Sequence, residues 1–477
     1  MSRAADSAPW RLLGLWLAVT AAALLTRPLL PVDETRYLAV AWEMWQRGDF
    51  LVPYLNGQPY SHKPPLLFWL VQAGWALFGV NAWSARLLAP LLALACLWLT
   101  ARLARALWPD DPQAGPLAVW LLFGTLFWLL FMTLVQFDLL LTLCALLAFL
   151  GLVQAAGGSG RGWLLTGLGI GLGVLAKGPV ILVVVLPPAL LAPWWAPGRA
   201  WLRWYLGAAG ALALGVLIAL AWALPAAGAG GEAYRQAIFW GQSAGRVVQS
   251  FAHRAPWWTY LALLPLMALP WIAWPALWRA LRGRWPRLDA GLRFCLAGLL
   301  PALLLFSLIS GKQAKYLLPL LPLLALALAR LLTRAGAAGL LPRVRRVATA
   351  MAVLVVALHL LVVPFVRAPF DVTPLARRIA ALQAQGAVVA NLGKYHGQYH
   401  FPGRLRQPLV VLARRDAVAP WLRAHRQAYL LVYYPDPAPS VPAGVYWQRY
   451  RGGSVVLWPV RMLVGRPARL DDPAASA

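Results

Sequence analysis

Residues 138–156 read DLLLTLCALLAFLGLVQAA, one carboxylate followed by eighteen residues without a charged side chain. An α-helix needs about 20 apolar residues to cross the hydrocarbon core of a bilayer. The stretch therefore predicts a membrane-spanning helix that begins beside an acid. An isolated acid at such a place is a functional candidate; the alternative is that Asp138 caps the helix, and one side chain can do both.

The rest of the chain repeats this pattern. Of its 477 residues 61% are hydrophobic and only 12% are charged, whereas a soluble domain carries roughly twice that charged fraction. Further apolar segments fall at residues 12–31, 64–80, 84–107, 116–135, 162–177, 179–196, 203–224, 257–278, 292–310, 314–333 and 347–366. The sequence therefore predicts an all-α polytopic membrane protein with about 11–13 transmembrane helices.

The charge of the chain is strongly unbalanced, with 43 Lys and Arg against 15 Asp and Glu and a formal net charge of +28. In a soluble protein this excess would suggest a nucleic acid partner. Here the arginines gather in short gaps between apolar segments, at residues 102–105, 161, 199–203, 279–287 and 330–346. Such gaps lie on the cytoplasmic side of a membrane, so we expect no nucleic acid partner.

The side of the membrane follows from these basic gaps. They alternate with the other gaps only if one early segment does not span, and the short segment 64–80, which begins with two prolines, is the best candidate. Read as an interfacial helix in the first outer loop, it leaves eleven spans. The outer face then holds the loop 32–83, Asp138, Lys177, the loops 225–256 and 311–315, and the tail after residue 366.

The composition changes near residue 370. Residues 375–385 and 417–425 have the pattern of helices, and residues 387–391, 408–412, 429–434 and 454–460 that of short strands. We therefore predict a membrane domain over residues 1–370 and a small soluble α/β domain over residues 371–477 on the outer face.

Asp33 and Glu34 follow the first apolar segment directly, at a depth where an unpaired carboxylate is costly. Arg36 and Tyr37 add a cation and a hydroxyl group one turn later. A carboxylate in this setting suits a general base or a group that orients an acceptor. The alternative is a solvated acidic pair at a helix end.

Several cations of the predicted outer face depart from the charge bias of the other loops. Lys63 precedes two prolines that open a helix, a position where a phosphate can bind. Arg246, Lys312 and Lys315 lie in outer loops as well, and an anionic ligand would account for them. The alternative for Lys63 is a lysine that reaches along the interface. His62 and His253 share this face and could bind Zn²⁺ or a similar ion.

These motifs, taken in order along the chain, resemble the glycosyltransferases of the membrane C-type fold. The nearest branch, family 39, contains the dolichyl-phosphate-mannose protein mannosyltransferases and the lipid A aminoarabinose transferase. The motifs are Asp33-Glu34-Thr35-Arg36-Tyr37, Lys63-Pro64-Pro65-Leu66, Asp138, Lys177-Gly178-Pro179 and residues 311–319, GKQAKYLLP.

The resemblance implies an inverting transfer of a sugar from a polyprenyl-phosphate donor. Asp33 would be the catalytic carboxylate, with Asp138 and Glu34 as further acids of the site. The remaining expected contacts are Lys63, Arg246, Lys312, Lys315 and Tyr316 to the donor phosphate, and Arg36 and Tyr37 to the acceptor or sugar.

One position departs from the family pattern. Family members often have Glu before the lysine, and in the lipid A branch this Glu pairs with a later His at a metal. Here the position is His62, and His253 matches the later His. Either a two-histidine site for a Zn-like ion persists or the metal role is lost.

We therefore expect a multi-pass enzyme of the bacterial inner membrane, with its active site and C-terminal domain on the periplasmic side. Its expected partners are the lipid bilayer, a polyprenyl-phosphate sugar donor and a lipid A-like glycolipid acceptor. A protein acceptor, as in protein O-mannosyltransferases, is the alternative within enzymes. A lipid-linked sugar flippase or transporter and a binding or scaffolding protein are the alternatives from other classes.

Overall fold

The computed structural model describes residues 8–241, 255–281, 288–335, 339–435 and 440–465. The chain forms two compact units. The helical unit comprises Met1–Ala23, Ser61–Leu70 and Gly74–Ala357, and the mixed unit comprises Leu24–Tyr60, Val71–Ala73 and Leu358–Ala477. The division predicted at residue 370 stays a prediction.

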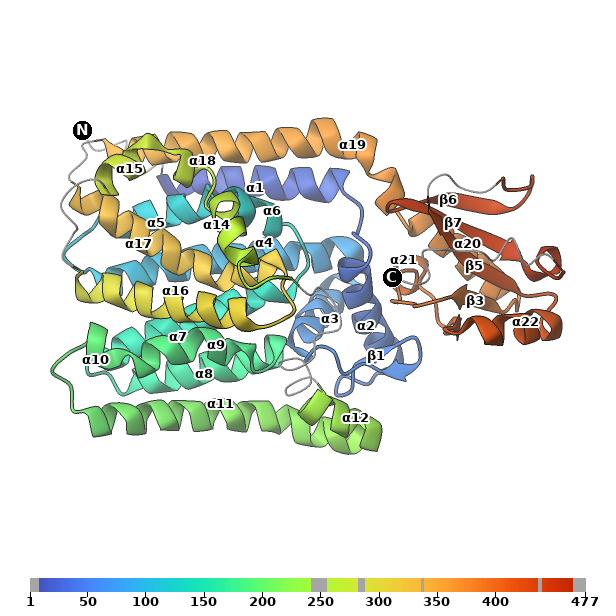
Figure 1. Ribbon diagram of the computed structural model, residues 1–477, viewed down its shortest axis with the longest axis horizontal. Helices are drawn as coiled ribbons and strands as arrows, with labels where there is room; N and C mark the ends of the chain where they lie inside the picture. The colour runs from blue at the N-terminus through green and yellow to red at the C-terminus, as the bar shows by residue number, and fades with distance from the viewer. Residues whose placement is uncertain (1–7, 242–254, 282–287, 336–338, 436–439, 466–477) are drawn as a thin grey trace. The chain divides into compact units, whose positions relative to one another are not determined.

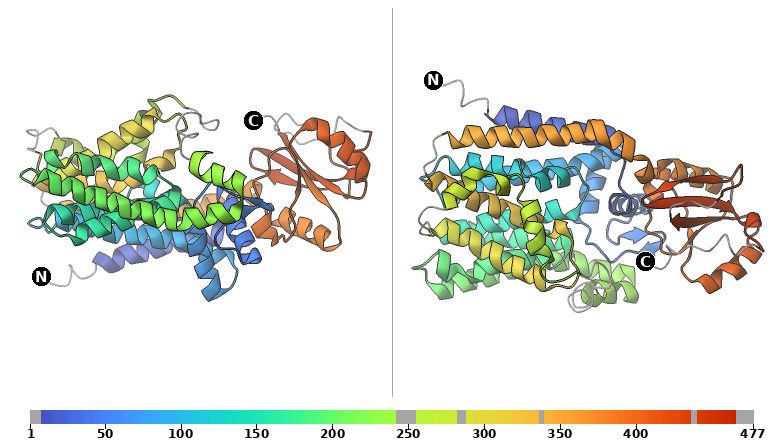
Figure 2. Two further views of the ribbon diagram at one scale, coloured as in Figure 1. Left: turned by 90° about the horizontal axis from the view of Figure 1, so that it is seen from below. Right: turned by 45° about the horizontal axis from the view of Figure 1, so that its top comes forward.

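The long helices of the helical unit are roughly aligned with one another (Figures 1 and 2). Its helices are α1 (Ala8–Thr26), α3 (Leu66–Phe78), α4 (Ala82–Leu107), α5 (Ala114–Phe123), α6 (Leu126–Phe131), α7 (Phe137–Ala156), α8 (Arg161–Lys177), α9 (Val180–Leu190), α10 (Ala192–Trp195), α11 (Trp201–Gly230), α12 (Glu232–Gln236), α14 (Thr259–Met267), α15 (Pro275–Leu281), α16 (Ala290–Leu308), α17 (Leu321–Arg334) and α18 (Leu340–Ala357). The 3₁₀ segment η3 (Ala314–Leu320) leads into α17.

Within the described residues, seven helices are long and apolar enough to cross a membrane by length and composition. Three shorter apolar helices, among them α3 and α5, accompany them. The chain is therefore a polytopic helical membrane protein, as predicted, while the number of 11–13 spans stays a prediction. The predicted continuous segment 116–135 is instead divided into α5 and α6, because Thr125 has an extended backbone between them.

The packing of α7 against α8 depends on small residues. A side chain on Gly169 would begin 2.7 Å from the backbone nitrogen of Ala148, and one on Gly151 would begin 2.6 Å from that of Thr166. Glycines at such positions allow two helix backbones to approach closely. Because α7 and α8 are antiparallel neighbours joined by a short turn, their close packing brings the start of α7 to the end of α8.

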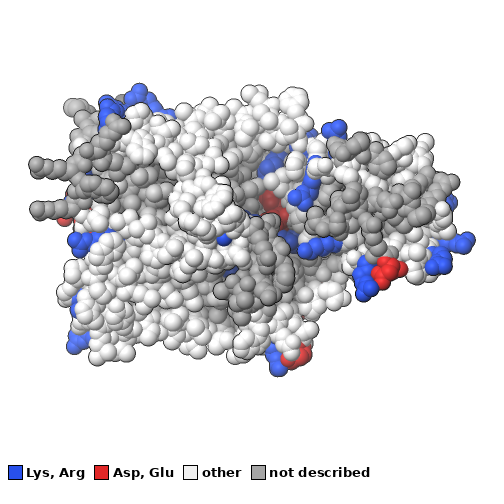
Figure 3. Space-filling view, in the orientation of Figure 1, with Lys and Arg blue, Asp and Glu red and all other residues white. Residues whose placement is uncertain are grey.

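At the end of the helical unit opposite to the start of α7 and the end of α8, an ion-pair network joins three elements. Arg330 of α17 donates to Asp111, 2.7 Å away, and to Asp289, 2.8 Å away. Burial alone would raise the pKa of Asp111, but hydrogen bonds from Thr333 and Arg330 more than offset this, so its pKa is lowered. Along the length of the helices, the visible face of the unit is nearly free of charge (Figure 3), as expected for a surface that faces lipid.

The mixed unit contains a five-stranded sheet in the order β4-β3-β5-β7-β6. Strand β3 is parallel to β4 and β5, and β7 is antiparallel to β5 and β6. Its elements are α2 (Asp33–Arg47), β1 (Tyr54–Leu55), β2 (Gln58–Pro59), α19 (Val363–Val366), α20 (Thr373–Ala384), β3 (Val389–Leu392), α21 (His400–Gly403), β4 (Val410–Leu412), α22 (Arg415–Ala424), β5 (Tyr429–Pro435), β6 (Tyr446–Tyr450) and β7 (Gly453–Pro459).

The predicted C-terminal α/β domain is confirmed, with both of its helices and all four predicted strands near their expected places. Strand β6 was not predicted. Its sequence YWQRY mixes aromatic and polar residues, and its side chains are half-buried or exposed at the edge of the sheet. Helix α20 packs on one core of the domain, through Leu375 and Ile379, and α22 packs on the other, through Val418 and Leu422.

Candidate active site

Asp33 is the first residue of α2, where the helix dipole favours a negative charge. Its carboxylate lies 2.6 Å from the guanidinium of Arg36, one turn later. The side chain of Asp33 is 35% exposed and that of Arg36 is 19% exposed. The acid is therefore held in place by the guanidinium, yet it stays accessible to a ligand.

Glu34, the neighbouring acid, is buried. The guanidinium of Arg27 donates to both of its carboxylate oxygens, and the amide of Leu30 donates a further hydrogen bond of 2.9 Å. These contacts fix the turn that leads into α2. The geometry thus favours a positioning role for Glu34 over the catalytic role predicted from the sequence.

Tyr37 is also buried, and the guanidinium of Arg36 lies 5.5 Å from the centre of its ring. Such a stacked arrangement restricts the conformations of the arginine. Of the predicted acceptor contacts Arg36 and Tyr37, Arg36 is therefore the one with partial access to solvent, and the ring of Tyr37 packs against its guanidinium.

In the helical unit, Asp138 near the start of α7 forms an ion pair with Lys177 at the end of α8. The side chain of Asp138 is 3% exposed and that of Lys177 is 8% exposed. The ammonium of Lys177 also lies 4.3 Å from the ring centre of Tyr316 in η3. A buried ion pair and the half-buried ring of Tyr316, from distant parts of the sequence, therefore lie together.

Lys63 lies at the same end of α7, because its ammonium is 5.5 Å from the ring centre of Phe137, the residue before Asp138. It is half-buried. The structure therefore brings together three residues that the sequence predicts for the site, namely Lys63, Asp138 and Tyr316. Lys177, which was predicted to lie on the outer face and belongs to one of the family motifs, joins them.

Lys312 is buried at the turn after α16. Its ammonium donates to the carbonyl oxygens of Ile309, at 2.7 Å, and Ala255, at 2.9 Å. Two of its three donors thus hold the backbone of the turn, and a phosphate contact through the third stays a prediction. Lys315 is half-buried, and its contact with the donor phosphate also stays a prediction.

Two predicted residues, Arg246 and His253, lie outside the described residues. His62 is exposed. Across the described parts of the chain, no group of three or more His, Cys, Asp or Glu residues could hold a metal ion. Because His253 is outside them, the two-histidine ion site stays a prediction and no step of the reaction is routed through it.

The loop from Gly393 to His400, GKYHGQYH, lies in the same unit as Asp33 and was not predicted from the sequence. Two tyrosines and two histidines within eight residues are an unusual density of polar rings and could have marked it. Burial, together with the positive charges of Arg36, Lys394 and Arg451, lowers the pKa of His396 to about 4. The electrostatic influence of Arg36 on His396 connects this loop to the start of α2.

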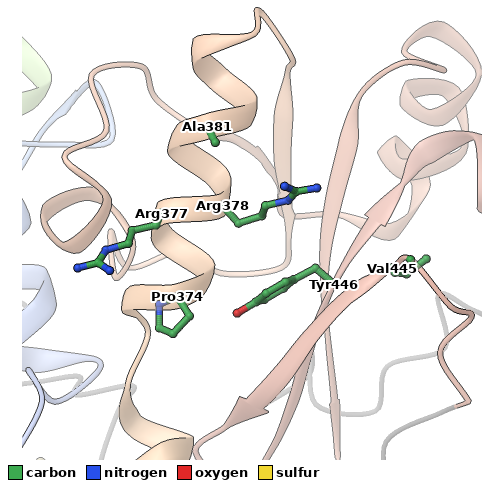
Figure 4. Close-up of a pocket in the computed structure, with 7 residues that line it drawn as sticks. Pro374, Arg377, Arg378, Ala381, Val445 and Tyr446 are labelled. Carbon is green, nitrogen blue, oxygen red and sulfur yellow. The ribbon is translucent and has the colours of Figure 1, made fainter.

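An open groove of about 580 Å³ crosses the surface of the C-terminal domain (Figure 4). It is lined by α20 residues, including Arg377 and Arg378, and by Tyr446 of β6. None of the predicted site residues that the structure describes lines it.

Residues 62–226 match the model of the family described as dolichyl-phosphate-mannose-protein mannosyltransferase. This region contains Lys63, Asp138 and Lys177 and excludes Asp33.

The chain is similar to two curated transferases. It is 31% identical over 333 residues to undecaprenyl phosphate-alpha-4-amino-4-deoxy-L-arabinose arabinosyl transferase 2 of Pseudomonas fluorescens, a match that covers 66% of this chain and 58% of the relative. It is 34% identical over 312 residues to the corresponding transferase of Pseudomonas aeruginosa, covering 63% of this chain and 55% of the relative. The matched part thus spans less than two thirds of each relative's length.

The fold is similar to that of two solved structures. One is the crystal structure of ArnT from Cupriavidus metallidurans bound to undecaprenyl phosphate, with 19% identity, a TM-score of 0.76 and coverage of 95% of this chain and 98% of that chain. The other is the oligosaccharyltransferase of Archaeoglobus fulgidus, with 12% identity, a TM-score of 0.54 and coverage of 89% and 69%. Family match, relatives and fold therefore agree with the motifs: residues 62–226 are similar to the mannosyltransferase family, part of the chain is similar to the aminoarabinose transferases, and the fold is similar to that of ArnT.

Proposed function

We propose that the chain is an integral-membrane glycosyltransferase that moves a sugar from a polyprenyl-phosphate donor to a lipid A-like glycolipid. The observation that carries this proposal is Asp33, a partly exposed carboxylate at a helix N-terminus that is paired with Arg36. The names of the curated relatives favour 4-amino-4-deoxy-arabinose as the sugar and undecaprenyl phosphate as its carrier.

In this reaction an oxygen of the acceptor, from a hydroxyl or an ionised group, attacks the anomeric carbon of the sugar, and the bond from that carbon to the phosphate oxygen breaks. The configuration inverts and polyprenyl phosphate leaves with the electron pair. Asp33 accepts the proton of a hydroxyl acceptor, or orients an acceptor group that is already ionised. The guanidinium of Arg36 holds the carboxylate of Asp33 in position for the acceptor.

The departing phosphate carries negative charge that must be stabilised as the bond breaks. In the helical unit, the half-buried ammonium of Lys63 is the group we assign to this task. Asp138 neutralises Lys177 and fixes the ends of α7 and α8, so we assign the pair to shaping the donor site. Tyr316 packs on Lys177 and offers a hydroxyl group to the donor.

We place the enzyme in the bacterial inner membrane, with its site on the periplasmic side. The clustering of arginines in alternate gaps of the chain supports this orientation. A cysteine introduced in place of Ala82 tests it, because the native cysteines Cys96, Cys144 and Cys295 are all buried. Labelling of intact cells by an impermeant thiol reagent is expected, and labelling only from the cytoplasmic side would contradict the orientation.

A protein acceptor is the second candidate, favoured by the description of the family that matches residues 62–226. The two acceptors are separated by one assay. Purified protein in lipid nanodiscs receives undecaprenyl-phosphate-linked aminoarabinose with lipid A, with a Ser/Thr-rich polypeptide or with neither.

Release of undecaprenyl phosphate together with a mass increase of lipid A is the expected result. A mass increase of the polypeptide alone would favour the second candidate. A lack of release with either acceptor, in protein shown to be folded, would overturn the proposed transfer. Mass spectrometry of envelope glycolipids from a deletion strain provides the matching test in cells.

A further inference from the structure

The loop before α21 packs directly against α2, the helix that begins with Asp33. Gly397 has a positive φ of 72°, and a side chain there would begin 2.4 Å from Leu55 and 3.3 Å from the β-carbon of Ala39. Ala39 follows Arg36 by three residues and therefore lies on the same side of the helix, about one turn away. The residue before the glycine, His396, is thus brought alongside the first turns of α2.

Specific hydrogen bonds fix this arrangement within the mixed unit. Asn56 donates to the carbonyl oxygen of Leu409, at 2.9 Å, and accepts from the amide of the same residue, at 2.8 Å. The indole of Trp42 in α2 donates to the carbonyl oxygen of Leu405, at 3.0 Å. The C-terminal domain is therefore joined to α2 by paired polar contacts that define one relative position.

A buried network supports the loop from inside the domain. The hydroxyl of Tyr433 donates to Asn391, at 2.8 Å, and accepts from Gln398, at 2.9 Å. It also lies 3.1 Å from the hydroxyl of Tyr399. Buried polar groups that satisfy one another in this way hold a single conformation, so the loop presents its outer side chains from a rigid base.

The charges around His396 are mostly positive. Lys394 and Arg451 are exposed. Together with Arg36 they act on His396 as three cations, against the single carboxylate of Asp33. Because the imidazole stays neutral in these surroundings, it can donate one hydrogen bond without adding further charge. This combination suits an anionic group with several acceptor oxygens.

We propose that Lys394, His396 and Arg451 of the C-terminal domain form, with Arg36, the site that recognises an anionic group of the acceptor beside Asp33. The proposal rests on the proposed function and assigns acceptor selection to a domain outside the helical unit. The shared chemistry is that of a phosphate or a carboxylate on the acceptor headgroup.

The decisive measurement separates the acceptor from the donor. In the Lys394→Met/His396→Asn variant we expect the KM for a phosphorylated glycolipid to rise about tenfold or more, because a charge-assisted contact is lost. The KM for the donor and kcat are expected to stay within about twofold. Lys394→Arg keeps the charge and is expected to keep most of the affinity.

Arg423→Met is the matched control. It removes one exposed positive charge from α22, a helix that packs on the other core of the same domain. The wild-type protein and the Arg423→Met control are expected to prefer a phosphorylated over a dephosphorylated acceptor. The Lys394→Met/His396→Asn variant is expected to lose that preference. If the wild-type protein prefers a carboxylate-bearing acceptor over a neutral one but shows no preference for a phosphate-bearing acceptor, the recognised group is a carboxylate.

An unchanged acceptor KM in the Lys394→Met/His396→Asn variant, or an equal rise in the donor KM, would overturn the proposal. If the wild-type protein shows no transfer, binding of phosphorylated and dephosphorylated glycolipid in nanodiscs provides the separate test. Tighter binding of the phosphorylated form, lost in the variant, supports the site even if the proposed transfer fails; equal binding overturns it.

Discussion

Asp138 of the helical unit and Asp33 of the mixed unit are held in opposite ways. The side chain of Asp138 in the helical unit is almost fully buried and is paired with the largely buried ammonium of Lys177. Asp33 in the mixed unit is one third exposed and paired with Arg36 on its own helix. A buried acid keeps its ion-pair partner, because separating the two charges leaves one of them unsolvated. A half-exposed acid can exchange its partner for a ligand, and this difference leads us to assign the proton transfer to Asp33.

The strongest test of this comparison is Asp33→Asn. Loss of a general base costs roughly 10²–10⁴-fold in rate, so we expect release of polyprenyl phosphate to fall by about this factor. The measurement is single-turnover release with acceptor present. The control is Asp416→Asn. It removes an exposed carboxylate of α22 that is paired with Arg414. Wild-type rates in Asp33→Asn protein would remove the basis for the assignment.

The buried pair gives the next largest effect, on stability. Asp138→Asn and Lys177→Met each leave a buried charge without its partner, which costs about 3–5 kcal/mol. The double replacement Asp138→Leu/Lys177→Met removes both charges and is expected to recover most of this loss. Apparent Tm values in nanodiscs report the difference. If the single variants melt like the wild type, the pair does not stabilise the helical unit as inferred.

Acid sensitivity separates the two units further. Burial lowers the pKa of His400 in the mixed unit to about 4, whereas an unfolded histidine has a pKa of about 6.5. Between these values the unfolded chain binds more protons, so stability falls as the pH falls from 6.5 towards 4. From pH 7 to pH 5 this amounts to about 2 kcal/mol for His400. His400→Gln is expected to make the apparent Tm less dependent on pH, and an unchanged pH dependence would contradict this account.

The smallest effect concerns Tyr316, whose ring packs on Lys177. Tyr316→Phe keeps the ring and is expected to leave the apparent Tm unchanged, while Tyr316→Leu costs about 0.5–1 kcal/mol. Activity gives the second readout. If the hydroxyl group contacts the donor, Tyr316→Phe raises the donor KM without changing stability. An unchanged donor KM would limit Tyr316 to packing on Lys177.

The comparison also shows where sequence reasoning succeeds. Residues 138–156 and 162–177 were predicted as helices to within about one residue, because apolar length is a local property. The prediction of one continuous segment over residues 116–135 was wrong. The break at Thr125 is accompanied by a hydrogen bond from Leu126 to the distant Leu269, which no local pattern contains.

The site shows the same division. The motifs identified Asp33, Lys63 and Asp138, and their roles stay predictions. They gave no sign that Glu34 is buried against Arg27 or that Lys177 pairs with Asp138. The loop from Gly393 to His400 lies some 360 residues after Asp33, and only folding brings it to α2.

The sequence by itself determined a polytopic helical protein with a small α/β domain, since hydrophobic length, charge distribution and strand patterning are properties of short segments. The tertiary structure alone decided which carboxylate is locked and which stays accessible. It also decided that the C-terminal domain is joined to the helix that carries Asp33. The physical reason is that burial, partner choice and local charge depend on contacts between residues far apart in the chain.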